Sequence, residues 1–282
     1  MSDSFQAQYR PLLEADPRWG AVACLPWDEA IFGFPVAALS LGAAPLPAGP
    51  LMAFTAALRE FCRETKAELV SASAPGDGAL TQSVLCAAGF VPVEFSLLAQ
   101  IPHLTLARLP QPRFSLRPAG LHDHDAVRRI ARVAFTFGRY HGDPRFPRAL
   151  ADLRYSHWIQ RALDGRDPGG HVFVLGTSAS VAGFMHVVIR EGHADLRLGA
   201  VDPENDLGFA GFSLYAETLR AVCALGARSA SAKIAAANTR VLNVCAMLGF
   251  RFSNPESAFH WHAPHAPHLL PAAFISAEKE QL

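Results

Sequence analysis

Residues 200–211 read AVDPENDLGFAG, and this short run connects an apolar strand pattern to a long helical pattern. Gly208, Ala210 and Gly211 are small, so the backbone there can approach a ligand closely. The first turn of the following helix offers unpaired N–H groups and the positive end of the helix dipole. The run therefore predicts an anion site, most naturally for a pyrophosphate, although a plain tight turn between a strand and a helix has the same composition.

The segments around this run predict an α/β fold with a mixed sheet. Residues 193–201 alternate apolar and polar positions, which is typical of a strand, and the apolar positions are Ala194, Leu196, Leu198 and Ala200. In the helix that follows, one face carries Phe212, Tyr215, Leu219 and Val222. An earlier helix is expected to begin at Asp123 as its N-cap and to bury Val127, Ile130 and Val133. This α+β order differs from that of a doubly wound nucleotide-binding fold.

Two segments of the chain end alike, which indicates an imperfect internal repeat. Residues 79–98 read ALTQSVLCAAGFVPVEFSLL, and residues 237–261 read ANTRVLNVCAMLGFRFSNPESAFHW. Each predicts a short helix closed by Gly-Phe and then an extended segment. Gly89 and Gly249 suit the left-handed position that often follows a helix.

The repeat and a proline-rich stretch predict the domain boundaries. We expect a smaller, degenerate N-terminal domain over residues 1–107 and a linker over 108–113. The main domain is expected over 114–263, followed by a C-terminal tail over 264–282 that is at best partly ordered.

Composition narrows the class of protein. Half of the 282 residues are hydrophobic, and 25 Lys and Arg balance 25 Asp and Glu, so nothing indicates binding to nucleic acid or to an anionic membrane. The number of cysteines, five, is odd and no CxxC motif occurs, which favours free thiols in a reducing compartment. Without a signal-peptide pattern or a membrane-spanning apolar run, the expected location is the cytoplasm.

The run at 200–211, together with ANTRVLNVCAMLGFRF from residue 237, resembles the signature of the GNAT N-acyltransferase superfamily. The loop motif of that family is Gln/Arg-x-x-Gly-x-Gly/Ala, and Asn205, Gly208 and Ala210 take its places here. The resemblance covers about residues 114–262 and implies a GNAT-like fold for both domains.

Two further segments are similar to one branch of that superfamily, the two-domain sugar acyltransferases that include dTDP-fucosamine acetyltransferase. LPWDEAIFGFPVAAL, residues 25–39, resembles the N-terminal segment of that branch. Residues 138–163, which begin GRYHGDPRFP, resemble its acceptor-side loop and helix.

The resemblance implies that acetyl-CoA or another acyl-CoA is the cosubstrate and that no metal takes part. The implied contacts are Leu198, Ala200 and Val201 for the pantetheine arm, Leu207, Gly208, Phe209, Ala210 and Gly211 for the pyrophosphate, and Asn238 at the start of the next helix. Asn238 is equally suited to be a plain N-cap. The loop is one residue shorter than the common form and carries Phe209, so a different acyl chain or an acyl carrier protein also stays open as the donor.

The resemblance implies catalytic roles at two positions. Asp195, on the strand before the loop, takes the place of the family's base or water-orienting carboxylate; it also suits a surface pair with Arg197 or Arg190. Cys245 stands where the family has a Tyr that acts as general acid. Cys245 either donates a proton or packs as a small buried residue, and Tyr215, Tyr140 or a water are alternative acids.

The acceptor is expected to be a nucleotide-linked amino sugar. Its contacts would be Arg139, Tyr140, His141, Arg145 and Phe146, in a loop that also carries Asp143. Arginine pairs with diphosphate and an aromatic ring stacks on a base. The rival interpretation is a solvated loop whose charges bind nothing.

Four histidines near the C-terminus, His260, His262, His265 and His268, raise the question of a metal site. His260 and His262 would share a strand face, but no Cys or carboxylate next to them completes a known pattern, so no metal is expected.

The sequence thus predicts an acyl-CoA-dependent N-acyltransferase acting on the amine of a small-molecule acceptor. Acyl transfer to another small amine in a secondary-metabolite pathway and non-catalytic acyl-CoA binding are the alternatives. The oligomeric state is open, with a homodimer among the options.

Overall fold

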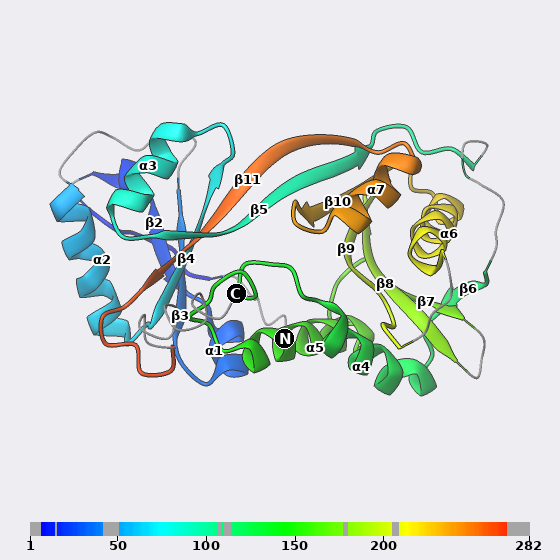
Figure 1. Ribbon diagram of the computed structural model, residues 1–282, viewed down its shortest axis with the longest axis horizontal. Coiled ribbons are helices and arrows are strands. Elements are labelled where there is room, and N and C mark those ends of the chain that lie inside the picture. Colours follow the sequence, from blue (N-terminus) through cyan, green and yellow to red (C-terminus); the bar gives the residue numbers. More distant parts are fainter. Residues whose placement is uncertain are drawn as a thin grey trace, which may run out of the picture. The chain divides into compact units, whose positions relative to one another are not determined.

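The computed structural model describes residues 7–14, 16–41, 51–106, 109, 114–176, 180–204 and 209–269. Figure 1 shows its helices and strands. The strands are β1 (Arg10–Pro11), β2 (Ala21–Cys24), β3 (Val36–Ser40), β4 (Leu69–Pro75), β5 (Val91–Ile101), β6 (Leu116–Pro118), β7 (Gly170–Gly176), β8 (Val181–Arg190), β9 (His193–Val201), β10 (Ser229–Ala235) and β11 (Arg251–His262). The α-helices are α1 (Pro26–Phe32), α2 (Leu51–Thr65), α3 (Ala79–Ala87), α4 (His124–Ala134), α5 (Arg148–Leu163), α6 (Ala210–Ala224) and α7 (Thr239–Met247), and short 3-10 turns span Pro17–Trp19 and Leu121–Asp123.

The first of two compact units contains residues 1–95, 138–151 and 255–282. Its strands follow the order β1-β2-β3-β4-β11, in which β3 and β4 are parallel and the other neighbours are antiparallel. Alternate residues of β3 and β4 enter two apolar clusters, so both faces of this sheet are covered. One cluster contains residues of α2 and α3 and the other contains residues of α1.

The second unit contains residues 96–137 and 152–254. Its strands follow the order β5-β10-β9-β8-β7-β6, and β9–β10 is the parallel pair among antiparallel neighbours. Met185 of β8 packs in a cluster with α6, while its neighbour Phe184 packs in a cluster with α4 and α5. The helices therefore cover both faces of a mixed sheet (Figure 1), which confirms the predicted α/β class.

The closing strands of the two sequence repeats are exchanged between the units. β11, which follows the second repeat helix, pairs with β4 through Glu256–His262 in the first unit. β5, which follows the first repeat helix, pairs with β10 through Ser96–Ile101 in the second unit. Contacts between residues therefore divide the chain differently from the expected domains, whose bounds are 1–107, 108–113, 114–263 and 264–282. Those bounds follow the order of the repeats and stay a prediction. Most of the linker and the tail beyond residue 269 lie outside the described residues.

The two repeat helices end as predicted. α3 and α7 are each followed by a glycine in the left-handed region, with φ of +92° at Gly89 and +81° at Gly249. A side chain is strained at such φ values, which explains the Gly-Phe signal in both segments.

A β-bulge in β9 overturns one expectation about that strand. Val187 of β8 faces Leu196, but the next residue back, His186, faces Leu198, so Arg197 is the extra residue. As a result Ala194 and Leu196 pack in the cluster with α6, whereas Leu198 and Ala200 pack in the cluster with α4 and α5. The expectation of one continuous apolar face was therefore wrong.

Two details of α4 also differ from the sequence prediction. Asp123 precedes the helix, but its carboxylate accepts hydrogen bonds from Arg117 and from the Gly120 N–H rather than capping α4. Val133 is 50% exposed, because the buried face of this helix runs through Val127, Ile130, Ala131 and Ala134 and Val133 lies off that face.

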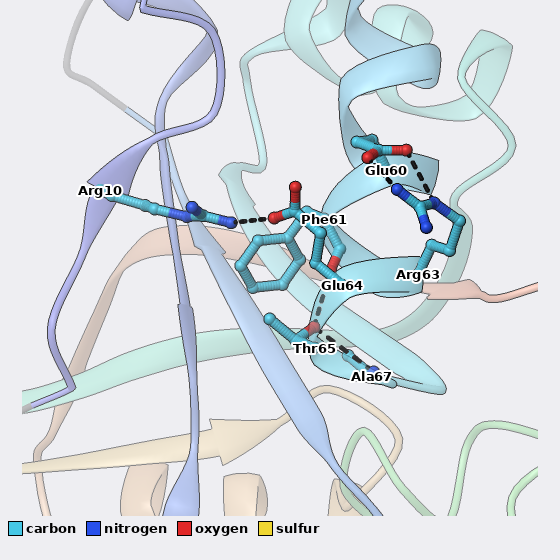
Figure 2. A network of polar contacts seen from close by, with 7 residues as sticks. All are labelled: Arg10, Glu60, Phe61, Arg63, Glu64, Thr65 and Ala67. Atoms are coloured by element: carbon cyan, nitrogen blue, oxygen red, sulfur yellow. Dashed lines mark hydrogen bonds and ion pairs between the residues drawn. The ribbon is translucent and has the colours of Figure 1, made fainter.

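The C-terminal end of α2 is fixed by polar contacts within the first unit (Figure 2). Arg10 of β1 donates to Glu64 at 2.9 Å, and its guanidinium lies 5.3 Å from the centre of the Phe61 ring. The Thr65 hydroxyl donates to the Phe61 carbonyl, four residues back, at 2.7 Å, which ties its side chain to the last turn of the helix.

No helix within the described residues is both long enough and apolar enough to cross a bilayer.

Candidate functional site

β9 and β10 separate after a short stretch of parallel pairing. The paired positions are His193↔Ser229, Ala194↔Ala230 and Asp195↔Ser231. Beyond Asp195, β9 pairs only with β8 and β10 pairs only with β5. In the described part of the chain, residues 196–201 of β9 therefore have a backbone edge with no strand partner on the β10 side. Unpaired N–H and C=O groups on such an edge can accept an extended ligand as an added strand.

The N-terminus of α6 lies nine positions after the end of β9. Ala210 begins the helix, and Phe209 precedes it with φ of +67° and a 67% exposed side chain. Among the described residues no side chain caps this helix end. A Cβ added at Gly211 would meet nothing within 4 Å, so there is space beside the first turn. The first N–H groups are therefore placed to bind an anion. Leu207 and Gly208, also expected to contact pyrophosphate, lie outside the described residues.

An ion pair fixes the chain where it leaves β9. The Asp202 side chain is buried, and Arg129 of α4 donates to both of its carboxylate oxygens. The backbone N–H of Asp202 donates to the Ala182 carbonyl at 2.9 Å. Arg129 holds the pKa of Asp202 below its usual value, because the guanidinium stabilises the ionised carboxylate. Two parallel N–H···O bonds also define an orientation, so this pair anchors the start of the loop.

Asp195 lies at the point where β9 and β10 separate. Its carboxylate accepts a hydrogen bond from Nε of Arg197 at 2.9 Å, and its side chain is 43% exposed. The pair with Arg197, one of the alternatives for this residue, is therefore present. Alternation along the strand places Asp195 on the opposite face from Leu196, the face that α4 and α5 cover.

A buried histidine lies on the same face as Asp195. His186 of β8 is fully buried, and its Nε2 lies 3.4 Å from a carboxylate oxygen of Asp167. Burial lowers the pKa of His186 to about 4, although the nearby Asp167 acts in the opposite direction. The imidazole is therefore neutral at physiological pH. His193, at the start of β9, instead bonds Ser229 and Ser231 of β10, each at 2.8 Å, and so fastens the paired end of the two strands.

Cys245 of α7 and Tyr215 of α6 pack in the same apolar cluster. Cys245 is fully buried, and burial raises the pKa of its thiol to about 12. Burial also raises the pKa of Tyr215, and the nearby Cys245 adds to this effect. Both groups are therefore protonated at neutral pH and are reluctant proton donors.

Asn238 has the alternative role proposed for it, that of an N-cap. Its side-chain oxygen accepts the Val241 N–H at 3.2 Å at the start of α7.

The expected acceptor loop lies in the first unit, and its aromatic residues are buried. Tyr140 and Phe146 are each 3% exposed and pack against Phe32 of α1. Tyr140 also donates to Asp28 at 2.8 Å. Arg139, half-buried, lies 5.1 Å from the centre of the Tyr140 ring. His141 and Arg145 are half-buried as well. Their role as acceptor contacts stays a prediction.

The same loop brings a carboxylate to the C-terminal histidines. Oδ2 of Asp143 lies 2.7 Å from Nδ1 of His260 and 2.8 Å from Nε2 of His262. Burial alone raises the pKa of Asp143, but the two imidazoles outweigh it and hold that pKa well below its usual value. The sequence pattern did not reveal this carboxylate, because Asp143 lies 117 positions from His260.

A cavity of about 430 Å³ lies elsewhere in the second unit. It is lined by β6, β7 and the last turn of α6, including Leu116, Phe173 and Leu225. None of the site residues predicted from the sequence lines this cavity.

No protein-family model matches the chain. Solved structures do: a GCN5-related N-acetyltransferase (GNAT) from Kribbella flavida aligns over 94% of this chain and 93% of its own, with a TM-score of 0.59 at 14% identity. One from Sphaerobacter thermophilus aligns over 86% and 76%, with a TM-score of 0.59 at 13% identity. A tandem GNAT protein from the clavulanic acid biosynthesis pathway aligns over 82% and 76%, with a TM-score of 0.53 at 16% identity. The chain therefore has the GNAT fold, as the sequence resemblance predicted.

Among curated proteins, the chain is similar to the spore coat polysaccharide biosynthesis protein SpsD of Bacillus subtilis (strain 168). The two are 28% identical over 155 residues, which are 54% of this chain and 51% of SpsD. The chain thus matches about half the length of this relative.

Proposed function

We propose that the chain transfers an acyl group from an acyl-CoA to the amine of a nucleotide-linked amino sugar. The observation that carries the proposal is the separation of β9 from β10 after Asp195, next to a helix whose first turn is uncapped among the described residues. In a fold shared with N-acetyltransferases, an open strand edge followed by an anion-binding helix end suits a long donor with a diphosphate.

The donor fits the residues on both sides of the loop. The backbone of Leu198, Ala200 and Val201 would pair with the amides of the pantetheine arm, as an added strand does. The N–H groups of Ala210 and Gly211 would hold the pyrophosphate, and Leu207, Gly208 and Phe209 would complete its cradle. Bound acyl-CoA supplies the thioester that is attacked. We propose acetyl-CoA as the donor, and a cytoplasmic location follows from the sequence as a prediction.

Asp195 would prepare the acceptor for attack. An acceptor amine is protonated at neutral pH and must lose a proton before its nitrogen can attack the thioester. Asp195 lies at the end of the paired stretch and is partly exposed, so it can take that proton directly or through a water. Arg197 holds its carboxylate in one orientation through the hydrogen bond from Nε.

The departing thiolate needs little help. A thiol of ordinary pKa, about 8.5, leaves as a thiolate without a strong general acid. Cys245 and Tyr215 both hold their protons in a buried cluster, and Cys245 is the better fitted to a packing role. We therefore propose that water protonates the thiolate, which explains why the chain tolerates Cys245 where the family has Tyr.

The sugar acceptor is supported by the name of the curated relative, a polysaccharide biosynthesis protein. Arg139 and Arg145 are half-buried cations in the loop that resembles an acceptor loop, and guanidinium groups suit a diphosphate. Tyr140 and Phe146 would then support this loop from the apolar cluster rather than stack on the base, because both rings are buried.

A second candidate is transfer to another small amine. It is favoured by the likeness to a tandem GNAT protein from the clavulanic acid biosynthesis pathway, a protein of a different kind of pathway from SpsD.

An acceptor screen tests the proposal. The chain is incubated with acetyl-CoA and a panel of amines: nucleotide-linked amino sugars, the same sugars without the nucleotide, and small amines without a sugar. Released thiol and product mass are measured. We expect turnover on a nucleotide-linked amino sugar, with a hydroxyl analogue inert. Turnover only on other amines supports the second candidate, and stabilisation by coenzyme A with no turnover on any amine supports non-catalytic binding.

A further inference from the structure

We propose that Asp143, His260 and His262 form a binding site for a divalent transition-metal ion, with Zn²⁺ as the best fit. The site lies wholly within the first unit and is independent of the proposed acyl transfer. The three ligand atoms all lie within 4.8 Å of one another. The side chains of Asp143 and His260 are fully buried, and that of His262 is 6% exposed.

The histidines are held side by side by β11. They are two positions apart on one strand, so their side chains point to the same face. The strand is fixed by antiparallel pairing with β4, where His260 faces Ser71 and His262 faces Leu69. Two imidazoles on a paired strand are preorganised ligands, because little side-chain or backbone freedom is left to lose on binding.

The carboxylate is fixed just as firmly by its loop. Oδ1 of Asp143 accepts the Arg145 N–H at 2.9 Å, which leaves Oδ2 to face the imidazoles. Gly142 packs so closely that an added Cβ would lie 1.9 Å from the Val93 carbonyl oxygen. The Phe146 N–H donates to the Asp143 carbonyl at 3.0 Å. These contacts orient one oxygen, as backbone contacts to metal-binding carboxylates commonly do.

The donor set matches the chemistry of the ion. Two imidazole nitrogens and one carboxylate oxygen are ligands that Zn²⁺ takes in sites that keep one position for water or a small ligand. Metal–ligand distances of about 2.0–2.2 Å place tetrahedral ligand atoms roughly 3.4 Å apart. The present separations of 2.7 and 2.8 Å would have to open by about 0.6–0.7 Å to reach that spacing. On binding, the proton on each imidazole nitrogen that faces Asp143 moves through solvent to the other ring nitrogen, and the nitrogen that it leaves binds the ion.

Zinc binding by the full chain, purified without a histidine tag and treated with a chelator, tests the site. Titration calorimetry and metal analysis after dialysis against Zn²⁺ should give one tightly held ion per chain. His262→Gln should weaken binding roughly 100-fold or more, because it removes one of three protein ligands. His265→Gln, which removes an exposed histidine three positions away, should bind as the wild type does.

A spectroscopic measurement on the unmutated chain guards against a variant that fails to fold. Co²⁺ in a site of few ligands gives intense visible bands, whereas adventitious six-coordinate Co²⁺ gives weak ones. We expect intense bands that Zn²⁺ abolishes. The proposal is overturned if the wild type holds no ion after dialysis, if binding survives His262→Gln in a folded variant, or if the Co²⁺ bands are weak.

Discussion

Asp195 is the residue whose chemistry most needs testing, because the structure shows it both at the strand separation and in a pair with Arg197. If it takes the proton of the acceptor amine, Asp195→Asn should lower kcat by about 100-fold or more, the usual contribution of a general base. The KM for acetyl-CoA should change little, since Asp195 is not among the proposed donor contacts. Steady-state kinetics with the acceptor found in the screen measures both.

Two control variants separate catalysis from pairing. Arg197→Gln removes the same ion pair, so equal and small losses in both variants would assign Asp195 to pairing alone. Asp125→Asn makes the same chemical change on a side chain that is 97% exposed and should leave kcat unaltered.

His186 should make the fold sensitive to mild acid. Its pKa of about 4 in the folded chain lies below the usual value of about 6.5, so the unfolded chain binds a proton more readily between these values. The stability that neutral His186 contributes is complete above pH 6.5 and is lost as the pH falls toward 4, by up to about 3 kcal/mol.

Denaturant unfolding at several pH values measures this effect. The wild type should lose more stability than His186→Gln between pH 6.5 and 4, and the difference isolates His186 from the other histidines. If NMR shows that the imidazole of His186 titrates near pH 6.5 in the folded chain, the prediction is wrong.

At the scale of residues, the sequence predicted side-chain contacts between residues that are close to each other in the sequence. The pair of Asp195 with Arg197 and the N-cap at Asn238 were both foreseen, because they involve neighbours two or three positions away. The contact of Asp143 with His260 was not, because only the folded sheet brings these segments together.

At the scale of elements, the N-terminus of α6 makes a specific prediction. Gly211→Asp places a negative charge in the first turn, where space is open. The helix dipole and the loss of glycine should stabilise the fold by roughly 1 kcal/mol. The same charge repels a pyrophosphate, so the KM for acetyl-CoA should rise about tenfold or more. Thermal unfolding and kinetics on one preparation measure both effects.

Gly211→Asn is the matched control, because Asn has nearly the size of Asp without its charge. An equal rise of KM in both variants would mean that the added bulk, rather than the charge, interferes, and no rise in either would remove the diphosphate from this helix end.

The elements themselves were largely predictable, and the bulge in β9 was not. Helix ends carry local signals such as the glycines after α3 and α7. The apolar alternation of residues 194–200 instead predicted a regular strand, and nothing in its composition marks Arg197 as the extra residue. A bulge depends on how β8 pairs alongside, which a single strand's sequence does not encode.

At the scale of the whole molecule, the exchanged strands predict that the two repeats do not fold alone. Residues 1–107 lack β11, and with it Phe259 and Trp261, which are buried in the first unit. Losing one buried aromatic side chain lowers the free energy of unfolding by about 3–5 kcal/mol. Losing two therefore removes a large part of the stability of a typical domain. Residues 114–282 lack β5 in the same way.

Expression of the two fragments tests this. Neither alone should unfold cooperatively, and co-expression should restore the cooperative transition. A cooperatively folded and active fragment 114–282 would instead support the domain boundaries expected from the sequence. The repeat was visible in the sequence, but the exchange of its last strands was not, because both arrangements give β5 and β11 the same pattern.

The proposed reaction depends on where acyl-CoA binds. A crystal structure with coenzyme A bound locates it directly. We expect the pantetheine arm along residues 198–201 of β9, with the diphosphate against the N–H groups of Ala210 and Gly211. Coenzyme A bound away from both of these elements would contradict the proposed donor site.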